Sequence, residues 1–274
     1  MIGSVFSPYY AWSGRNDPQN HVALNVGLYG RGGKRWTMTE RSRNNLVQEK
    51  HRLVIGPSDL AWDGNCLTIS IDEWANPILR KVVGQIKLFP NGISERVFQL
   101  DDKAQHFWQP LSPIAHAEVS FHRPSLNWKG KAYIDSNWGF EPLEKGFKNW
   151  DWSRGHTKSG AILLYDAFTR DETNRQLALK ADDHNNITDI EIEPRQKLKN
   201  APIWRVARTT LADPKTRPTT KKMLEDTPFY TRSYINTAHD KERILAVHES
   251  LDCDRFASSW VRCLLPFRMP RVTK

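Results

Sequence analysis

The segment from residue 130 to residue 155 reads GKAYIDSNWGFEPLEKGFKNWDWSRG. Its first ten residues hold Tyr, Ile and Trp between two glycines, a composition that is typical of a β-strand bounded by turns. Three tryptophans, Trp138, Trp150 and Trp152, surround one acid, Asp135. Leu and Val would fill a plain core without so many indole rings. The segment therefore indicates a strand beside something large, flat and apolar, or beside a transient cation.

Short segments rich in Val, Ile, Tyr, Phe and Trp recur along the whole chain, and turn signals such as GRGGK, FPNG and ADDHNN separate them. This pattern predicts an all-β fold, as a sandwich or a barrel. The expected strands include IWRVARTTL at 203–211. The first residues, MIGSVFSPYYAW, are also expected to form a strand, so that either the fold starts on a strand or an upstream piece is missing. One or two helical turns are expected in SSWVRCLLPF, ended by Pro266.

The segment HRPSLN, at residues 122–127, separates two series of strands of similar length. It predicts two β domains, residues 1–122 and residues 123–274. Two barrels in tandem fit this pattern better than one large sandwich does.

The composition limits the class of protein. Hydrophobic residues make up 39% and charged residues 26% of the 274 positions, which indicates a globular chain. The net charge of +9 suits an acidic partner, either nucleic acid or an anionic membrane surface, or simply a soluble basic surface. The Lys and Arg residues are scattered, so we expect no nucleic-acid partner. Cys66, Cys253 and Cys263 form no C-x-x-C pair and indicate thiols in a reducing compartment.

Several kinds of chemistry lack their motifs. The sequence has no G-x-S-x-G, no G-x-x-x-x-G-K-[ST] and no H-E-x-x-H, and its nine histidines are not spaced as metal ligands. We therefore expect no metal and no cofactor.

Two pairs of residues remain. His106 and Trp108 are two positions apart, and so are Tyr133 and Asp135. In a strand, such pairs point to the same face. If both strands line one cavity, an acid, a phenol, an imidazole and an indole meet in an apolar space. Each residue also has a structural explanation: a turn cap or an Arg partner for Asp135, core packing for Tyr133 and Trp108, and partial burial for His106.

This set of side chains suits the hydration of a plain alkene. Burial of an aspartate raises its pKa and keeps the acid protonated, so that it can protonate carbon. The resulting tertiary carbocation is stabilised by aromatic faces, by about 0.5–2 kcal/mol each when desolvated. A nearby histidine can take a proton from the attacking water.

Longer motifs carry a resemblance to a known family. The segments GSVFSPYYAW, RWTMTER, YIDSNWGFEPLEKGFKNWDWSR, LEDTPFYTRS and LLPFRMPR together resemble the carotenoid 1,2-hydratases, also called hydroxyneurosporene synthases, from residue 2 to residue 271. The resemblance implies two tandem lipocalin-like, calycin-type β domains. It implies that water adds across the C1–C2 double bond of acyclic carotenoids such as neurosporene and lycopene, without a cofactor.

The resemblance also implies roles for residues. Asp135 becomes the proton donor, Trp108 and Tyr133 stabilise and position the cation, and His106 positions water or acts as its base. Candidate substrate contacts are Trp138, Trp150, Trp152, Tyr9 and Tyr10, although the three tryptophans could equally close a core between domains.

Relatives usually carry a further segment before GSVFSPYYAW, so the first domain is expected to be short of strands or the start to be misplaced. The substrate dissolves in membrane, which implies a peripheral protein on the cytoplasmic side of the inner, photosynthetic membrane. The alternatives are a carrier of a polyene or isoprenoid, a polyene cyclase or isomerase that excludes water, and a nucleic-acid binder.

Overall fold

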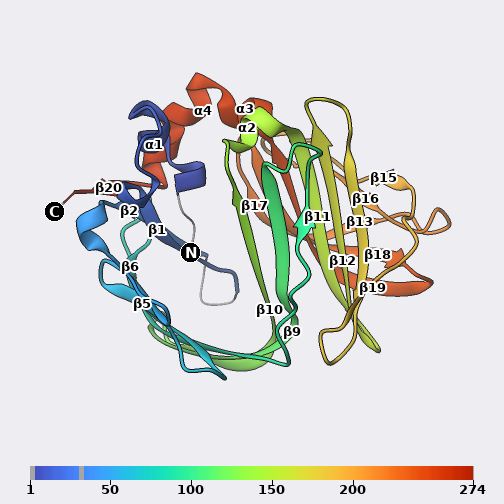
Figure 1. Cartoon of the computed structure of the whole chain (residues 1–274), viewed down its shortest axis with the longest axis horizontal. Helices are drawn as coiled ribbons and strands as arrows, with labels where there is room; N and C mark the ends of the chain where they lie inside the picture. Colours follow the sequence, from blue (N-terminus) through green and yellow to red (C-terminus); the bar gives the residue numbers. More distant parts are fainter. Residues whose placement is uncertain (1–3, 31–33, 274) are drawn as a thin grey trace. The chain divides into compact units, whose positions relative to one another are not determined.

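Twenty β-strands, four short α-helices and four 3-10 turns make up the ordered elements of residues 4–30 and 34–273, which the computed structural model describes (Figure 1). The sheets are open rather than closed on themselves. The prediction of a mainly β chain is confirmed at this level. The chain divides into two compact units, each made of separate stretches. Unit 1 comprises Met1–Pro90, His116–Ala132 and Arg262–Lys274, and unit 2 comprises Asn91–Ala115 and Tyr133–Val261.

Unit 1 contains two sheets. The smaller has the order β1-β2-β20, from β1 (Val22–Leu28), β2 (Arg35–Arg41) and β20 (Arg271–Val272). The larger has the order β10-β9-β7-β6-β5-β4-β3, where the strands are β3 (Leu46–Gln48), β4 (Arg52–Ile55), β5 (Ser58–Trp62), β6 (Leu67–Trp74), β7 (Lys81–Pro90), β9 (His106–Arg123) and β10 (Leu126–Gly139). Apolar side chains of β1, β6, β7 and β9 pack together into its core, among them Leu24, Ile71, Val82, Val119 and Phe121.

Unit 2 is built on a seven-stranded antiparallel sheet with the order β14-β13-β12-β11-β19-β18-β17. Its strands are β11 (Phe147–Thr157), β12 (Gly160–Thr169), β13 (Arg175–Ala181), β14 (Ile187–Asp189), β17 (Thr219–Asp226), β18 (Tyr230–His239) and β19 (Glu242–Asp252). A two-stranded sheet joins β15 (Arg195–Lys197) to β16 (Thr209–Leu211), and β8 (Phe98–Gln99) pairs with β9. Strands β9 and β10 are the longest in the chain as described, and each contributes residues to both units.

The two faces of the seven-stranded sheet have different chemistry. Residues that pair directly across neighbouring strands point to the same face. On one face, Trp152 of β11 pairs with Tyr165 of β12 and with Glu249 of β19. The other face carries the apolar core of unit 2, which includes Ile162, Leu164, Leu198, Leu211, Ile235 and Ala246. The alternation along β11 therefore turns its tryptophans away from that core.

Short helical elements connect and flank these sheets. They are η1 (Ser4–Phe6), α1 (Pro8–Trp12), η2 (Pro18–Asn20), η3 (Arg43–Asn45), α2 (Leu143–Gly146), α3 (Cys253–Ala257), α4 (Ser259–Leu264) and η4 (Leu265–Phe267). The helix expected in SSWVRCLLPF is confirmed as α4, and the segment continues as the η4 turn that contains Pro266.

The expected N-terminal strand is wrong for the residues described. Residues 4–12 form η1 and α1 instead. Ser7 has an extended backbone and its side chain accepts a hydrogen bond from the backbone N–H of Tyr10, while Pro8 occupies the first helical turn. A serine cap followed by proline starts a helix regardless of the aromatic residues that follow. Residues 1–3 lie outside the described chain, so their part of this prediction is untested.

The strand expected over residues 203–211 is reduced to its last three residues, Thr209–Leu211. The Asp226 carboxylate accepts hydrogen bonds from the backbone N–H groups of Ile203 and Trp204, and Arg205 has a left-handed backbone with φ of 58°. This local turn removes the preceding residues from any ladder. The predicted boundary at residues 122–123 falls where β9 ends, and its meaning as a domain boundary stays a prediction.

Candidate active site

Strands β9 and β10 bring the two predicted pairs together. Trp108 is completely buried on β9, and its Nε1 donates a hydrogen bond of 2.9 Å to Oδ2 of Asp135 on β10. Tyr133 is close enough to Asp135 that the charge of the carboxylate raises the pKa of the phenol, after burial itself has raised it. Three of the four candidate catalytic residues therefore form one cluster, and all three belong to unit 2. Their roles stay predictions.

Asp135 combines exposed surface with a desolvated carboxyl group. The residue as a whole is exposed, yet burial of the carboxyl dominates its electrostatics and raises its pKa. The hydrogen bond from Trp108 acts in the opposite direction but does not reverse the shift. Protein atoms therefore surround the carboxyl group, although the residue keeps exposed surface. Such an acid keeps its proton to a higher pH and stays accessible to a reactant.

The Tyr133 hydroxyl is fully enclosed. Its oxygen is buried without a hydrogen-bond partner among the described residues, and the nearby Asp135 charge contributes to the raised pKa of the phenol. The Trp152 ring lies 5.4 Å from the ring of Tyr133, and the Arg154 guanidinium lies 5.3 Å from the same ring. Burial lowers the pKa of Arg154 to about 10, so the guanidinium is still a cation at neutral pH. A fixed positive charge therefore faces the phenol.

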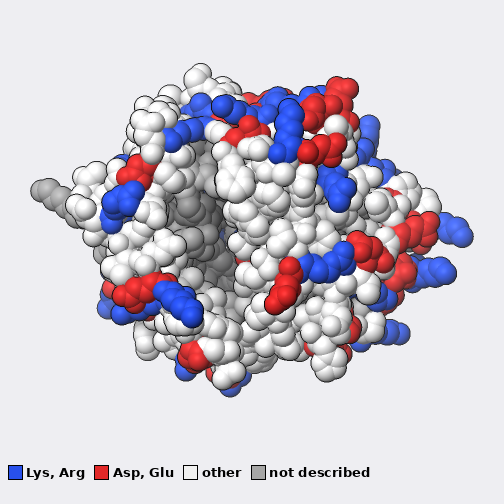
Figure 2. Space-filling view, viewed as in Figure 1, with Lys and Arg blue, Asp and Glu red and all other residues white. Residues whose placement is uncertain are grey.

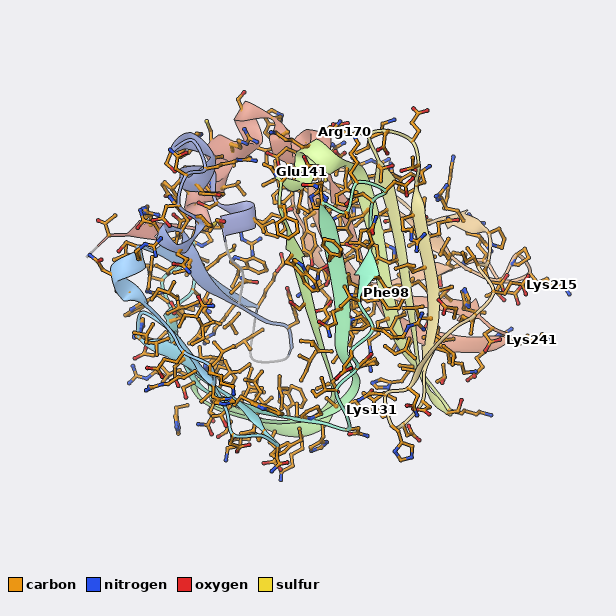
Figure 3. The ribbon with its side chains drawn as sticks, in the orientation of Figure 1. Phe98, Lys131, Glu141, Arg170, Lys215 and Lys241 are labelled. Atoms are coloured by element: carbon orange, nitrogen blue, oxygen red, sulfur yellow. The ribbon has the colours of Figure 1, made fainter. Side chains whose placement is uncertain are left out.

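An aromatic shell surrounds Trp108. Its ring centroid lies 5.3 Å from that of Tyr165 on β12 and 5.6 Å from that of Phe98 on β8, which Figure 3 labels. Trp150 lies 5.9 Å from Tyr165 on the same side. These rings come from β8, β9, β11 and β12, and they provide a desolvated, polarisable wall next to the Trp108–Asp135 hydrogen bond.

His106 lies on the same face of β9 as Trp108, but its own contacts are different. The Asp101 carboxylate accepts a hydrogen bond of 2.7 Å from the backbone N–H of His106, and its Oδ2 lies 3.2 Å from the ring Nδ1. The ring packs 4.6 Å from Phe147, and a Cβ added at Gly146 would lie 2.5 Å from Cε1 of His106. Within the described chain, Nε2 of His106 is buried without a partner, and no hydrogen bond or ring contact joins His106 to Asp135.

Helix α2 lies next to the His106 ring. Figure 3 shows Glu141 and Arg170 near α2, and Nε of Arg170 donates a hydrogen bond of 2.6 Å to the backbone oxygen of Glu144. The backbone N–H of Phe140 bonds the oxygen of Gln105, which fixes the end of β10 against the start of β9. Gly139, before α2, and Gly146, at its end, leave room for the His106 ring, because a Cβ at either position would lie within 3 Å of a ring atom.

The predicted substrate contacts fall in three places. Trp150 belongs to the aromatic shell described above, and Trp152 lies against the ring of Tyr133. Trp138 is exposed, and its ring stacks on that of Phe107 at a centroid distance of 5.6 Å. Tyr9 and Tyr10 lie in α1 of unit 1, where the Tyr10 hydroxyl donates to the oxygen of Arg15. The role of all five as substrate contacts stays a prediction.

Sequence reasoning missed four residues of this region: Asp101, Arg154, Tyr165 and Glu249. Asp101 occurs in LDDKA, which has the composition of an ordinary polar turn. Tyr165 occurs in an unbroken apolar run, where nothing separates it from a core residue. Arg154 and Glu249 reach the site only through the register of β11, β12 and β19, which no local pattern encodes.

Residues 4–30 and 34–273 include no group of three or more His, Cys, Asp or Glu side chains that could hold a metal ion. In the same part of the chain, every helix is too short or too polar to cross a bilayer. On the face seen in Figure 2, Lys and Arg are interspersed with Asp and Glu, so this face offers nucleic acid no continuous basic band.

Comparison with solved structures supports the fold. A putative AttH from Nitrosomonas europaea has a TM-score of 0.57 and 12% identity, over 85% of this chain and 81% of that one. The protein CghA, solved with Sch210972, has a TM-score of 0.53 and 11% identity, over 87% of this chain and 82% of that one. At these identities the likeness concerns the fold alone.

Comparison of sequences is more specific. The acyclic carotenoid 1,2-hydratase of Thiocapsa roseopersicina is 49% identical over 275 residues, which cover 99% of this chain and 68% of that protein. The enzymes of the same name from Rubrivivax gelatinosus and Cereibacter sphaeroides are 41% and 40% identical, each over 99% of this chain and over 68% and 96% of their own lengths. The profile of the family described as carotenoid hydratase CrtC matches residues 1–274. With this match along its whole length, and with relatives 40–49% identical to it, the chain belongs to the carotenoid hydratase CrtC family.

Proposed function

We propose that this chain adds water across the terminal C1–C2 double bond of an acyclic carotenoid, with Asp135 as the proton donor. The observation that carries the proposal is the hydrogen bond of 2.9 Å between Trp108 and Asp135 inside a shell of aromatic rings. An acid with a raised pKa, an accessible surface and aromatic neighbours has the properties that protonation of carbon requires.

The reaction proceeds in three balanced steps. The π electrons of the alkene form a new C2–H bond with the Asp135 proton, which leaves a carboxylate and a tertiary cation at C1. The oxygen of a water molecule then bonds to C1. The extra proton on that oxygen passes to the Asp135 carboxylate, directly or through a neighbouring group, and restores the acid. The net change is the addition of one water, with no oxidant, reductant or cofactor consumed.

The neighbouring side chains divide the remaining work. Trp108 and Trp152 are assigned as cation stabilisers, since an indole face stabilises a desolvated cation by about 0.5–2 kcal/mol. Tyr133 faces the Arg154 cation, which disfavours a second cation at the same ring, so we assign Tyr133 to positioning Asp135. His106 is assigned to holding the water, because its buried Nε2 has no partner among the described residues.

The long substrate requires an apolar path and access to a membrane. We propose that Trp138 and Trp150 contact the polyene, and we propose the same role for Tyr9 and Tyr10. We further propose peripheral attachment on the cytoplasmic side of the photosynthetic membrane. The net charge of +9 and the exposed Leu264 and Phe267 near the C-terminus support contact with an anionic leaflet.

The architecture proposed for this function is a tandem of lipocalin-like domains, residues 1–122 and residues 123–274. Its support is the β-rich chain with open sheets, together with the likeness of fold to the two solved structures. Expression of residues 123–274 alone tests the boundary. A cooperative unfolding transition is expected, and an unfolded product would overturn it.

The assay uses the purified full chain with lycopene or neurosporene in detergent, in water enriched in a heavy oxygen isotope, followed by chromatography and mass detection. The expected product is heavier than the substrate by one water and carries the labelled oxygen. A product with the mass of the substrate would indicate a cyclase or isomerase instead. Pigment that co-elutes with the protein without any product would indicate a carrier.

A further inference from the structure

A second carboxylate, Glu249, lies on the sheet face that carries the aromatic shell, and the reaction steps above do not use it. Glu249 is on β19, directly paired with Trp152 of β11 on one side and with Arg232 of β18 on the other. Trp152 in turn contacts the ring of Tyr133. The row Tyr165, Trp152, Glu249 and Arg232 thus runs across four strands on the face that carries the aromatic shell. The register of the sheet therefore places an acidic side chain on this face.

Glu249 forms an ion pair with Arg232. Nε of Arg232 lies 2.8 Å from Oε1 of Glu249, and the two side chains are 31% and 17% exposed. The carboxylate is therefore partly shielded from water, so that its charge acts over a longer distance than that of a surface glutamate. Arg232 compensates part of this charge but does not remove it.

The charge of Glu249 acts on the residues of the site. After burial, it is among the influences that raise the pKa of Asp135, and it also contributes to the raised pKa of Tyr165. The titratable and charged groups near Asp135 come from several strands: His106 lies on the same face of β9 as Trp108, and the others are Tyr133 on β10, Arg154 on β11, Tyr165 on β12, Arg232 on β18 and Glu249 on β19. Among these groups, Glu249 is the one carboxylate.

We propose that Glu249 is a positioning residue whose ion-paired carboxylate keeps Asp135 in the protonated form that delivers the proton. This inference rests on the proposed function. Proton donation to carbon requires Asp135 to be neutral, and a nearby negative charge favours the neutral form of an acid. Arg232 sets the strength of the effect, because its guanidinium partly cancels the carboxylate.

The test is the pH profile of hydration by the full chain, measured as turnover number and KM from pH 5 to pH 9. Glu249→Gln removes the charge, and the loss of activity on the alkaline side is expected to begin at lower pH than in the unaltered chain. Activity should be several-fold lower on the alkaline side of the profile and nearly equal at its acidic end, because the charge of Glu249 favours the neutral form of Asp135. Arg232→Gln leaves the carboxylate uncompensated and should move the same limb to higher pH.

Two further variants complete the comparison. Glu249→Asp retains the charge, so its loss of activity on the alkaline side should begin at the same pH as in the unaltered chain. Glu242→Gln, at the other end of β19, removes a carboxylate that pairs with Lys180 and should leave the profile unchanged. If Glu249→Gln folds poorly, the shift of the alkaline limb to higher pH in Arg232→Gln still tests the proposal. A carbon-13 NMR titration then measures the pKa of Asp135 without any need for turnover.

The outcomes separate the two proposals. If the unaltered chain forms no hydrated product at any pH, the proposed function is wrong. If the unaltered chain is active but both Glu249→Gln and Arg232→Gln lose activity at the same alkaline pH as the unaltered chain, the proposed role of Glu249 is wrong. The proposed hydration is then unaffected. A uniform loss of activity at all pH values in Glu249→Gln, with no shift, would also overturn the electrostatic role.

Discussion

The indole nitrogen of Trp108 and the carboxylate of Asp135 are joined by a hydrogen bond of 2.9 Å between two long strands, at a point where Trp108 has no exposed surface. The bond fixes the orientation of the carboxyl group, and it also favours the charged form of the acid. Burial acts against that preference and prevails, so the pKa of Asp135 is raised. The position of Asp135 and its protonation are thus controlled by different neighbours.

The substitution Trp108→Phe separates these two contributions. It removes the donor, so the pKa of Asp135 should rise further and the alkaline limb of the pH profile should move to higher pH. It also removes an indole face, so the turnover number at the optimum should fall by about tenfold. Trp204→Phe, at an exposed position in the same unit, is the matched control and should change neither quantity. A limb that moves to lower pH would contradict the assigned role of the bond.

A glycine makes room for His106. A methyl group at Gly146 would lie 2.5 Å from Cε1 and 2.9 Å from Nδ1 of that ring, so Gly146→Ala must displace the imidazole or α2. We expect a loss of stability of about 1–3 kcal/mol and a clear loss of turnover. Thermal unfolding and the product assay measure the two effects. Gly30→Ala, where an added Cβ meets nothing within 4 Å, should leave both nearly unchanged. Full activity in Gly146→Ala would show that the position of His106 does not matter.

Asp151 predicts the pH dependence of stability. It lies on the other face of the seven-stranded sheet, where Thr209 donates a hydrogen bond of 2.6 Å to Oδ2 and Ser250 donates to Oδ1. Burial raises the pKa of Asp151 from 3.8 to about 7. Between those two pH values the folded chain binds a proton that the unfolded chain has released, so the free energy of unfolding falls as the pH rises and levels off above about pH 7.

Asp151→Asn removes this dependence. From pH 5 to pH 8, the free energy of unfolding of the unaltered chain should fall by about 3 kcal/mol more than that of the variant, since each unit of pKa is worth about 1.4 kcal/mol. Urea unfolding at the two pH values measures the change. Asp189→Asn, at an exposed position in the same sheet, is the control and should show no such gain. Parallel stability curves for Asp151→Asn and the unaltered chain would mean that Asp151 is charged in the folded state.

The strand pattern predicted much of the β-rich fold, because period-2 patterning and turn residues act locally. It also indicated that Trp108 and Asp135 would each share a strand face with a second candidate, since that follows from spacing alone. It failed at residues 4–12, where the Ser7 cap and Pro8 outweigh the β preference of Val, Phe and Tyr. Around residue 203, a carboxylate distant in sequence, Asp226, holds the backbone in a turn.

The rest of the site depends on which strands are neighbours. Tyr165 and Glu249 are 84 residues apart in sequence, and both pair with Trp152, because β11 lies between β12 and β19. No local pattern specifies that order or its register. Asp101 could not be predicted for a related reason. An acid in a loop is typical of a turn, and only the structure shows that its carboxylate accepts a hydrogen bond of 2.7 Å from the backbone N–H of His106.

Asp135→Asn tests the central claim most directly. The amide keeps the size of the side chain and an oxygen that can accept the Trp108 hydrogen bond, but it has no acidic proton to deliver. We predict that the variant folds, binds lycopene with an affinity close to that of the unaltered chain, and forms no hydrated product. The measurement is the yield of hydrated carotenoid with oxygen labelled from solvent, made beside pigment binding on the same preparation. Hydration at the unaltered rate would contradict Asp135 as the proton donor, and loss of folding and binding together would show that the residue is structural.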